Sequence, residues 1–177
     1  YYRQQREEAE RLYREAESQF ERCGDEVARF GLRLDQAQWE SERGAWTQSA
    51  RLYTTALALS EARLFQPFQA SIQIRLANDQ LRLGRLKEAV SGLDAAERQD
   101  QLGGALKSGI ISGTRAQVYE ALGEDRTAEA LYRETLNWTM THQMQLVEPS
   151  IRIYLAGVLM RTGRAAQAVE HLEMASA

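Results

Sequence analysis

Cysteine, proline and long apolar runs are scarce in this sequence, and each scarcity excludes a class of protein. Cys23 is the only cysteine among 177 residues, so no disulfide can form within the chain, and a reducing, cytoplasmic compartment is expected. No apolar run reaches the roughly 18–20 residues of a membrane-spanning helix, and no basic-then-apolar leader is present. We therefore expect no membrane partner. The chain starts at Tyr1 and not at a methionine, which predicts a piece of a longer protein.

Charge of one sign and histidine are scarce as well. The 22 Lys and Arg against 25 Asp and Glu give a net charge of −3, whereas a nucleic-acid-binding surface is expected to be basic. His142 and His171 are the only histidines, and they fall on different expected helices, whereas metal sites and acid–base catalysis need groups that converge in one pocket. We therefore expect no catalytic residues, no metal, no cofactor and no direct binding of nucleic acid.

Residues that favour helices are abundant. Long stretches are rich in Ala, Leu, Glu, Arg and Gln, strand-like alternation is nearly absent, and the only prolines, Pro67 and Pro149, fall near expected helix starts, where a missing N–H costs little. A hydrophobic fraction of 44% is enough for a sizeable core, and the length fits one domain. The sequence predicts an all-α fold.

Four glycines mark an internal repeat. Each follows a helix-like segment, and they are spaced by 40, 39 and 40 residues: Gly44, Gly84, Gly123 and Gly163. Relative to each glycine, Leu or Ile stands at −12, Ala at −7, Ala or Ser at +5, Tyr or Leu at +9, and Ala or Thr at +12. Ala9, Tyr13 and Ala16 continue the last three columns if Gln4 takes the place of the glycine. Such agreement over several columns predicts a repeat protein.

The columns predict pairs of closely packed helices. Offsets +5, +9 and +12 lie on one face of a helix, and small residues at −7 and +5 let two backbones approach. A glycine between the two segments suits a helix C-terminus, where a left-handed backbone is easy only for glycine. The expected helices span residues 5–22, 27–43, 46–63, 67–83, 86–99, 105–122, 125–142, 149–162 and 165–176.

This pattern resembles the tetratricopeptide repeat (TPR) family. The family signature has a small residue in the first helix, then Gly, then Ala, a large residue and Ala in the second helix, and the matching residues of one repeat are Ala77, Gly84, Ala89, Leu93 and Ala96. The resemblance covers essentially the whole chain. It implies a right-handed superhelical solenoid of about nine helices in antiparallel pairs. As a single domain it would hold a half repeat at 1–24 and repeats at about 25–65, 66–104, 105–144 and 145–177.

Two features depart from the usual TPR signature. The period is about 40 residues and not 34, and the aromatic residue expected early in each first helix is replaced by Arg33, Gln73, Ser112 and Arg152. Repeats of this longer kind resemble those in bacterial regulators. The narrower expectation is therefore the sensor or interaction region of a larger bacterial regulator, by analogy alone.

The resemblance also implies a concave groove lined by the first helices, at offsets −13, −10, −6, −3 and −2. Amide side chains there could pair with a peptide backbone, arginines could hold a carboxylate, and isoleucines could seat apolar side chains. The candidate partner-binding residues are Gln38, Glu42, Ile74, Asn78, Arg82, Gln117, Ile153 and Arg161.

Two functions from different classes follow. The favoured one is a non-enzymatic scaffold that holds a protein or peptide segment in the groove. The alternative is a self-assembly element, a homo-oligomer that stacks through its terminal helices, because an uncapped repeat array tends to stack end to end. The two differ in where the partner binds: the groove in the first case, the terminal helices in the second.

Overall fold

The computed structural model describes residues 2–60, 65–100 and 108–176. These residues form nine α-helices and no strand, which confirms the all-α prediction. A short 3₁₀ turn, η1 (Gln66–Phe68), precedes the fourth helix. The helices are α1 (Tyr2–Cys23), α2 (Glu26–Glu42), α3 (Trp46–Leu59), α4 (Gln69–Arg82), α5 (Leu86–Asp100), α6 (Ser108–Ala121), α7 (Asp125–Thr141), α8 (Glu148–Arg161) and α9 (Ala165–Ser176). The expected end of the third helix at residue 63 and start of the sixth at residue 105 lie outside the described residues.

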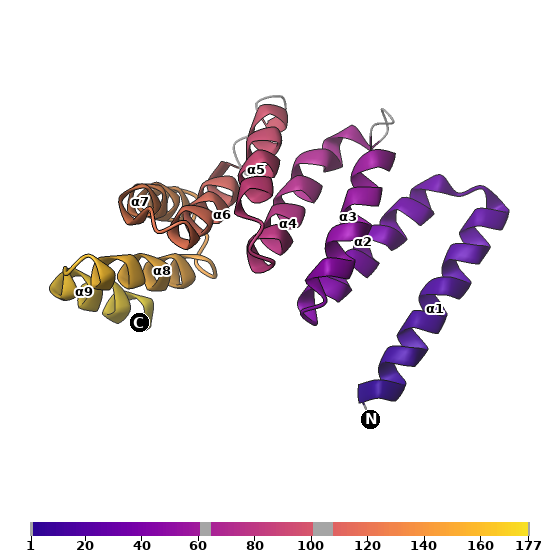
Figure 1. Ribbon diagram of the computed structural model, residues 1–177, viewed down its shortest axis with the longest axis horizontal. Coiled ribbons are helices and arrows are strands. Elements are labelled where there is room, and N and C mark those ends of the chain that lie inside the picture. The colour runs from indigo at the N-terminus through magenta and orange to yellow at the C-terminus, as the bar shows by residue number, and fades with distance from the viewer. Residues whose placement is uncertain (1, 61–64, 101–107, 177) are drawn as a thin grey trace.

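The helices form sequential antiparallel pairs, as the sequence predicts. Helices α2 and α3, α4 and α5, α6 and α7, and α8 and α9 pack together, and each second helix contacts the first helix of the next pair. Figure 1 shows the resulting array, with the N-terminal and C-terminal ends at opposite sides and with α1 diverging from the pairs. Helix α1 packs on α2.

The repeat glycines end the first helices. Gly44, Gly84, Gly123 and Gly163 have φ angles of +82°, +71°, +77° and +77°, a conformation that is easy only for glycine. After α4, the N–H of Gly84 donates to Leu81 O at 3.0 Å and the N–H of Arg85 donates to Gln80 O at 2.8 Å. This pair of bonds satisfies carbonyls that the end of the helix would leave free.

The repeat columns form the core. The small residues at −7 and +5 are all buried: Ala37, Ala77, Ala116, Ala156, Ser49, Ala89, Ala128 and Ala168. At +9, Tyr53, Leu93 and Tyr132 are buried as well, whereas Leu172 of α9 is 45% exposed. The difference arises because α4, α6 and α8 pack on α3, α5 and α7, while no described helix follows α9.

One buried carboxyl group joins two repeats. Asp79 of α4 is buried, and its Oδ1 accepts a hydrogen bond of 2.6 Å from the Ser41 hydroxyl of α2. Among the described residues, its Oδ2 has no hydrogen-bond partner. Burial raises the pKa of Asp79 above its ordinary value of 3.8, and the hydrogen bond from Ser41 opposes this shift without cancelling it. The ionised form of Asp79 is therefore disfavoured in the folded state.

Substitution of Ala116 by tryptophan tests the helix packing. Ala116 is buried in α6, so the larger side chain should overpack the contact with α7 and lower the free energy of unfolding by about 1–3 kcal/mol or more. Ala121→Trp is the control, because Ala121 lies on the same helix and is exposed. Urea denaturation measures both, and equal stability of the two variants would refute the packing described above.

Asp79→Asn tests the buried carboxyl. Because the folded pKa is raised, the folded state binds more protons than the unfolded chain between the two pKa values, so the Asp79 contribution to stability falls as pH rises through that interval. The stability of the variant relative to wild type should therefore increase from about pH 3 to about pH 7 in urea denaturation. Asp35→Asn, on the exposed surface of α2, is the control. A difference that stays flat or falls with pH would contradict the assignment.

Candidate functional site

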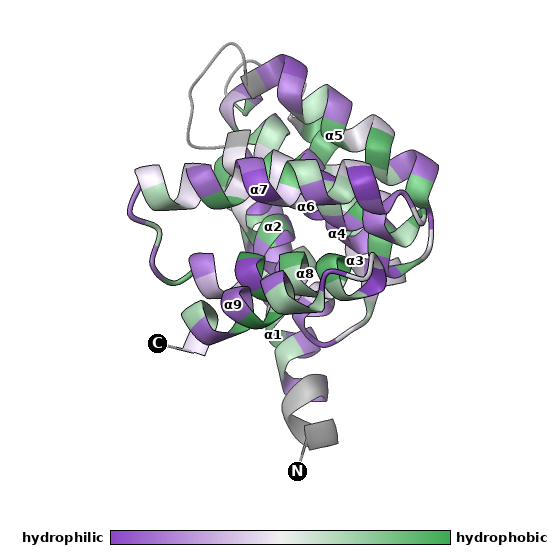
Figure 2. Ribbon diagram, turned by 90° about the vertical axis from the view of Figure 1, so that its left-hand side faces the viewer, coloured by the Kyte–Doolittle hydropathy of each residue, from purple (hydrophilic) through white to green (hydrophobic). Residues whose placement is uncertain are grey.

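The first helices of the pairs lie side by side. Helix α4 contacts α6, Arg75 of α4 donates to Gln38 Oε1 of α2 at 3.0 Å, and Arg161 of α8 lies 2.9 Å from Glu120 Oε1 of α6. Figure 2 views the array from the end that carries α7 to α9, and α2, α4, α6 and α8 lie toward the middle of this projection. We call the surface formed by offsets −13, −10, −6, −3 and −2 of these four helices the first-helix face.

The eight predicted partner-binding residues differ in how much surface they offer. Gln38, Glu42, Arg82, Ile153 and Arg161 are exposed, and Asn78 and Gln117 are half-buried. Ile74 is only 6% exposed, because it packs in a core cluster with Ile111 and Val118 of α6. The side chain of Ile74 thus contributes to the junction of α4 and α6, and it has little surface left for a partner.

Polar side chains on α2 and α4 form a small network. The Gln38 amide accepts from Arg75 through Oε1 and donates through Nε2 to Glu42 Oε1 at 2.7 Å. The Asn78 amide donates to the Ile74 carbonyl of its own helix at 3.2 Å. The Gln38 amide keeps a second N–H and a second oxygen lone pair for a peptide, and the Asn78 oxygen is free to accept a hydrogen bond within the described structure.

A recess of about 300 Å³ lies between α2 and α4. Its lining combines apolar side chains with charges of both signs: Leu34, Asp35, Gln38, Phe68, Ser71, Ile72 and Arg75. Sequence reasoning missed Asp35 and Arg75, which share offset −9, and Phe68, which precedes α4. The sequence does contain a signal for Asp35 and Arg75, because these oppositely charged residues occupy the same repeat column on neighbouring first helices.

The surface on α6 and α8 is more apolar. Ile110, Ile153 and Met160 are all exposed on the first-helix face. Gly157 stands between the last two, and a Cβ atom added there would meet only the Arg161 guanidinium, at 3.9 Å. A glycine inside a helix lowers helix stability by about 1 kcal/mol relative to alanine, so the stability of α8 does not account for a glycine at position 157. It leaves a shallow gap between two exposed apolar side chains.

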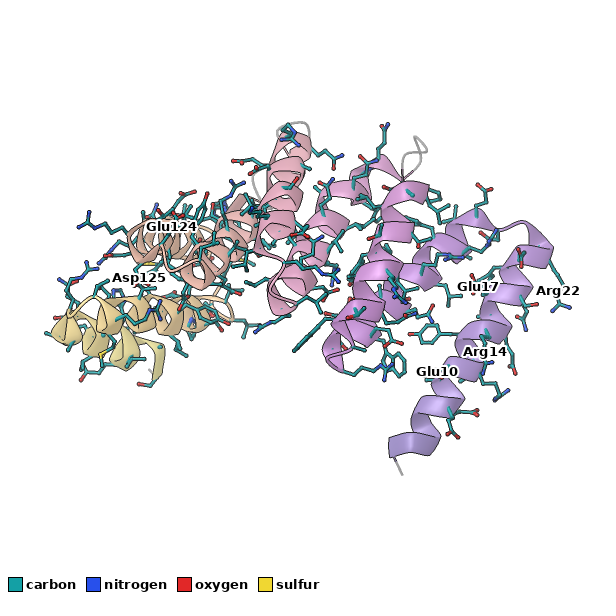
Figure 3. The ribbon with its side chains drawn as sticks, viewed as in Figure 1. Glu10, Arg14, Glu17, Arg22, Glu124 and Asp125 are labelled. Atoms are coloured by element: carbon teal, nitrogen blue, oxygen red, sulfur yellow. The ribbon has the colours of Figure 1, made fainter. Side chains whose placement is uncertain are left out.

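Arg161 already has acidic partners. It donates to Asp125 Oδ1 at 2.9 Å and lies equally close to Glu120, and these contacts raise the pKa of its guanidinium, the hydrogen bond to Asp125 most of all. The Tyr132 hydroxyl donates to the other Glu120 oxygen at 2.6 Å, and burial raises the pKa of Tyr132. Figure 3 shows Asp125 at the start of α7, next to the end of α8. A carboxylate from a partner would therefore meet a guanidinium whose charge two acids already compensate.

A second hollow lies between α1 and the first pair. It has a volume of about 690 Å³ and a mainly polar lining: Glu10, Arg14, Gln36, Glu40, Arg43, Ala45, Thr47 and Gln48. Glu17 extends from α1 toward α2 (Figure 3) and accepts a hydrogen bond from Arg33 at 2.7 Å, which ties the two helices together.

Within the described residues, no group of three or more His, Cys, Asp or Glu side chains could hold a metal ion. In that same part of the chain, no helix is long and apolar enough to cross a membrane.

No protein-family model and no curated protein matches the chain, but solved structures do. TPR-like repeats of a Podosopora anserina protein named as a kinesin light chain superpose with a TM-score of 0.74 at 17% identity, over 96% of this chain and 84% of that one. MamA superposes with a TM-score of 0.62 at 12% identity, over 93% of this chain and 83% of that one. BtubC from P. vanneervenii superposes with a TM-score of 0.58 at 16% identity, over 96% of this chain and 87% of that one. These likenesses show a TPR-like fold.

A pair of isoleucines at the same repeat offset tests the position of the face. Ile74→Ala should lower the free energy of unfolding by about 2–5 kcal/mol, because it leaves a cavity in the core, and Ile153→Ala should change it by less than about 1 kcal/mol, since Ile153 is 52% exposed. Thermal or urea unfolding measures both. Equal losses would mean that Ile153 is also a core residue and that α8 does not present this face.

Proposed function

We propose that the chain is a non-enzymatic scaffold that binds a protein or peptide segment along the first-helix face. The observation that carries this proposal is that three apolar side chains at face offsets of α6 and α8 are exposed on a TPR-like fold: Ile110, Ile153 and Met160. Exposed apolar side chains gathered on one face favour an interaction surface, whereas single ones scattered over a protein need no explanation. TPR-like folds in general present such surfaces to protein partners.

The face is suited to a peptide because its supports are rigid. The first helices are fixed by buried alanines at offset −7 and by hydrogen bonds between neighbouring first helices, such as Ser41 with Asp79. A rigid surface loses little conformational entropy on binding. The half-buried amides of Asn78 and Gln117 lie at offset −6 of adjacent helices, and each amide can both donate and accept, as a peptide backbone does.

The narrower expectations, a cytoplasmic location and a role as the sensor region of a bacterial regulator, remain predictions. The exposed, unpaired thiol of Cys23 fits the first of them. For the second, the proposal supplies only a mechanism: a peptide bridging several first helices would fix their relative orientation, and a change in that orientation is how a helical array transmits binding to attached domains.

The test of the proposal is to select peptides and then map where they bind. A phage-displayed library of random peptides of about twelve residues is selected on the wild-type chain, and the affinity of the recovered peptides is measured by fluorescence anisotropy. Ile153→Glu should weaken binding about tenfold or more, because it places a charge where an apolar side chain would be buried. Val169→Glu is the matched control, since Val169 is equally exposed on α9. Peptides that lose affinity only with the control substitution would refute the proposal.

The alternative, self-assembly, has one observation in its favour. Helix α9 exposes Val169, Leu172 and Met174, and Leu172 occupies the column that is buried by the following helix in the earlier pairs. If this surface joins two copies of the chain, wild type should sediment as an oligomer in analytical ultracentrifugation and Leu172→Glu should sediment as a monomer. A wild-type monomer at concentrations of about 100 μM, roughly the weak limit for a specific interface, would exclude the alternative.

A further inference from the structure

One column of the repeat carries an arginine twice, with different surroundings. Arg82 of α4 and Arg161 of α8 both stand at offset −2. Arg161 is held by Glu120, at offset −3 of the preceding first helix, and by Asp125, at offset +2 of the preceding pair. The repeat therefore contains an internal example of how an arginine at this position is neutralised: by two acids of the preceding repeat.

Arg82 lacks both acids. The residues at the two equivalent positions of its preceding repeat are Ser41 and Trp46, and neither carries a charge. The Ser41 hydroxyl donates to Asp79, as described above. Arg82 itself is exposed, and it makes no hydrogen bond or ion pair within the residues that the structure describes. The Arg82 guanidinium thus stands at the repeat position where Arg161 contacts two acids, but the equivalent positions beside Arg82 carry uncharged residues.

The other arginines of the first helices show that this is unusual for these four helices. All seven arginines of α2, α4, α6 and α8 are described, and within the described residues six of them contact an acid or an amide: Arg29 with Glu21, Arg33 with Glu17, Arg75 with Gln38, Arg115 with Asp94, Arg152 with Glu148, and Arg161 with Asp125. Arg82 is the seventh.

A third repeat shows the apolar version of the same contact. Offset −2 of α6 is Ala121, and the two equivalent positions before it are Leu81 and Leu86. In these two repeats, then, a cation accompanies acids and a small apolar residue accompanies apolar ones. Arg82 departs from that pattern, because its charge has no counterpart among the residues that the structure describes.

Beyond Arg82 the face changes character. Toward the C-terminal end, α6 and α8 present Ile110, Ile153 and Met160, with the gap at Gly157 between the last two. The two charged residues on this part of the face, Glu120 and Arg161, lie 2.9 Å apart and neutralise each other. The first-helix face therefore has two parts: a polar part on α2 and α4 with an unpaired cation, and an apolar part on α6 and α8.

We infer that the first-helix face takes a peptide segment that carries an acidic side chain for Arg82 and, further along, apolar side chains that pack against Ile110, Ile153 and Met160. This inference rests on the proposed function and specifies its partner. An arginine can donate two parallel hydrogen bonds to one carboxylate, which fixes orientation as well as charge. Because Arg82 is exposed, the contribution of this ion pair falls as salt rises. The apolar contacts do not share that dependence.

The experiment uses the peptides selected on the wild-type chain as the probe. Their sequences should share at least one Asp or Glu together with two or more large apolar residues, and Arg82→Glu should weaken them about tenfold at low salt, through loss of attraction and added repulsion. Arg82→Gln, which keeps a polar side chain and removes the charge, should weaken them less. Arg51→Glu on α3 is the matched control, because Arg51 is also exposed but lies on a second helix, and it should leave affinity within about twofold.

The decisive step is a charge exchange. Replacing the conserved acid of a selected peptide by lysine should abolish binding to wild type and restore it to Arg82→Glu, which only direct contact explains. Peptides that bind Arg82→Glu as well as wild type, yet lose affinity with Ile153→Glu, would overturn this inference and leave the proposed function standing. Peptides that are indifferent to both substitutions would overturn both. Circular dichroism of each variant confirms that the helices are intact.

Discussion

The structure depends on the close approach of helix backbones at small residues. Alanine at offset −7 of each first helix and alanine or serine at offset +5 of each second helix are buried, and they leave no room for a larger side chain. Where serine takes the place of alanine, at Ser49, its hydroxyl donates to the Ala37 carbonyl at 2.7 Å and so remains satisfied in the core. Protein interiors are packed as densely as organic crystals, so this spacing fixes where every other side chain of the repeat lies.

Polar contacts then set how one repeat meets the next. The junctions are crossed by Arg33 with Glu17, Ser41 with Asp79, Arg115 with Asp94, and Arg164 with Glu129. Most of these are partly exposed, and such pairs contribute little net stability. Their hydrogen-bond geometry is directional, however, so they favour one orientation of neighbouring pairs over others that would bury the same apolar area. The apolar columns supply the stability of the array, and the polar contacts help to select its curvature.

The proposed partner surface follows from residues that the columns leave free. The same residue recurs at an offset only where its packing neighbours are the same in every repeat. On the first-helix face, the neighbouring residues differ from one repeat to the next. Arg161 has two acids beside it, and Arg82 has Ser41 and Trp46 at the equivalent positions. Because of this difference between repeats, the two ends of the face differ: one end carries the Arg82 cation, and the other carries Ile153 and Met160. A bound segment would therefore favour one orientation along the face.

The sequence alone determined the architecture, since the features that define it are local or strictly periodic. A glycine that requires a left-handed backbone, such as Gly84, and the alanines spaced around it are visible without coordinates, and they predict the helices and their pairing. Only the tertiary structure decided which of the periodic residues are exposed on the first-helix face. Ile74 and Ile153 share offset −10, yet Ile74 is buried and Ile153 is exposed, because α6 packs against α4 over Ile74. The charge state of the face was hidden for the same reason: whether an arginine is free depends on the residues that a neighbouring repeat brings next to it, and those are about 40 residues away in the chain.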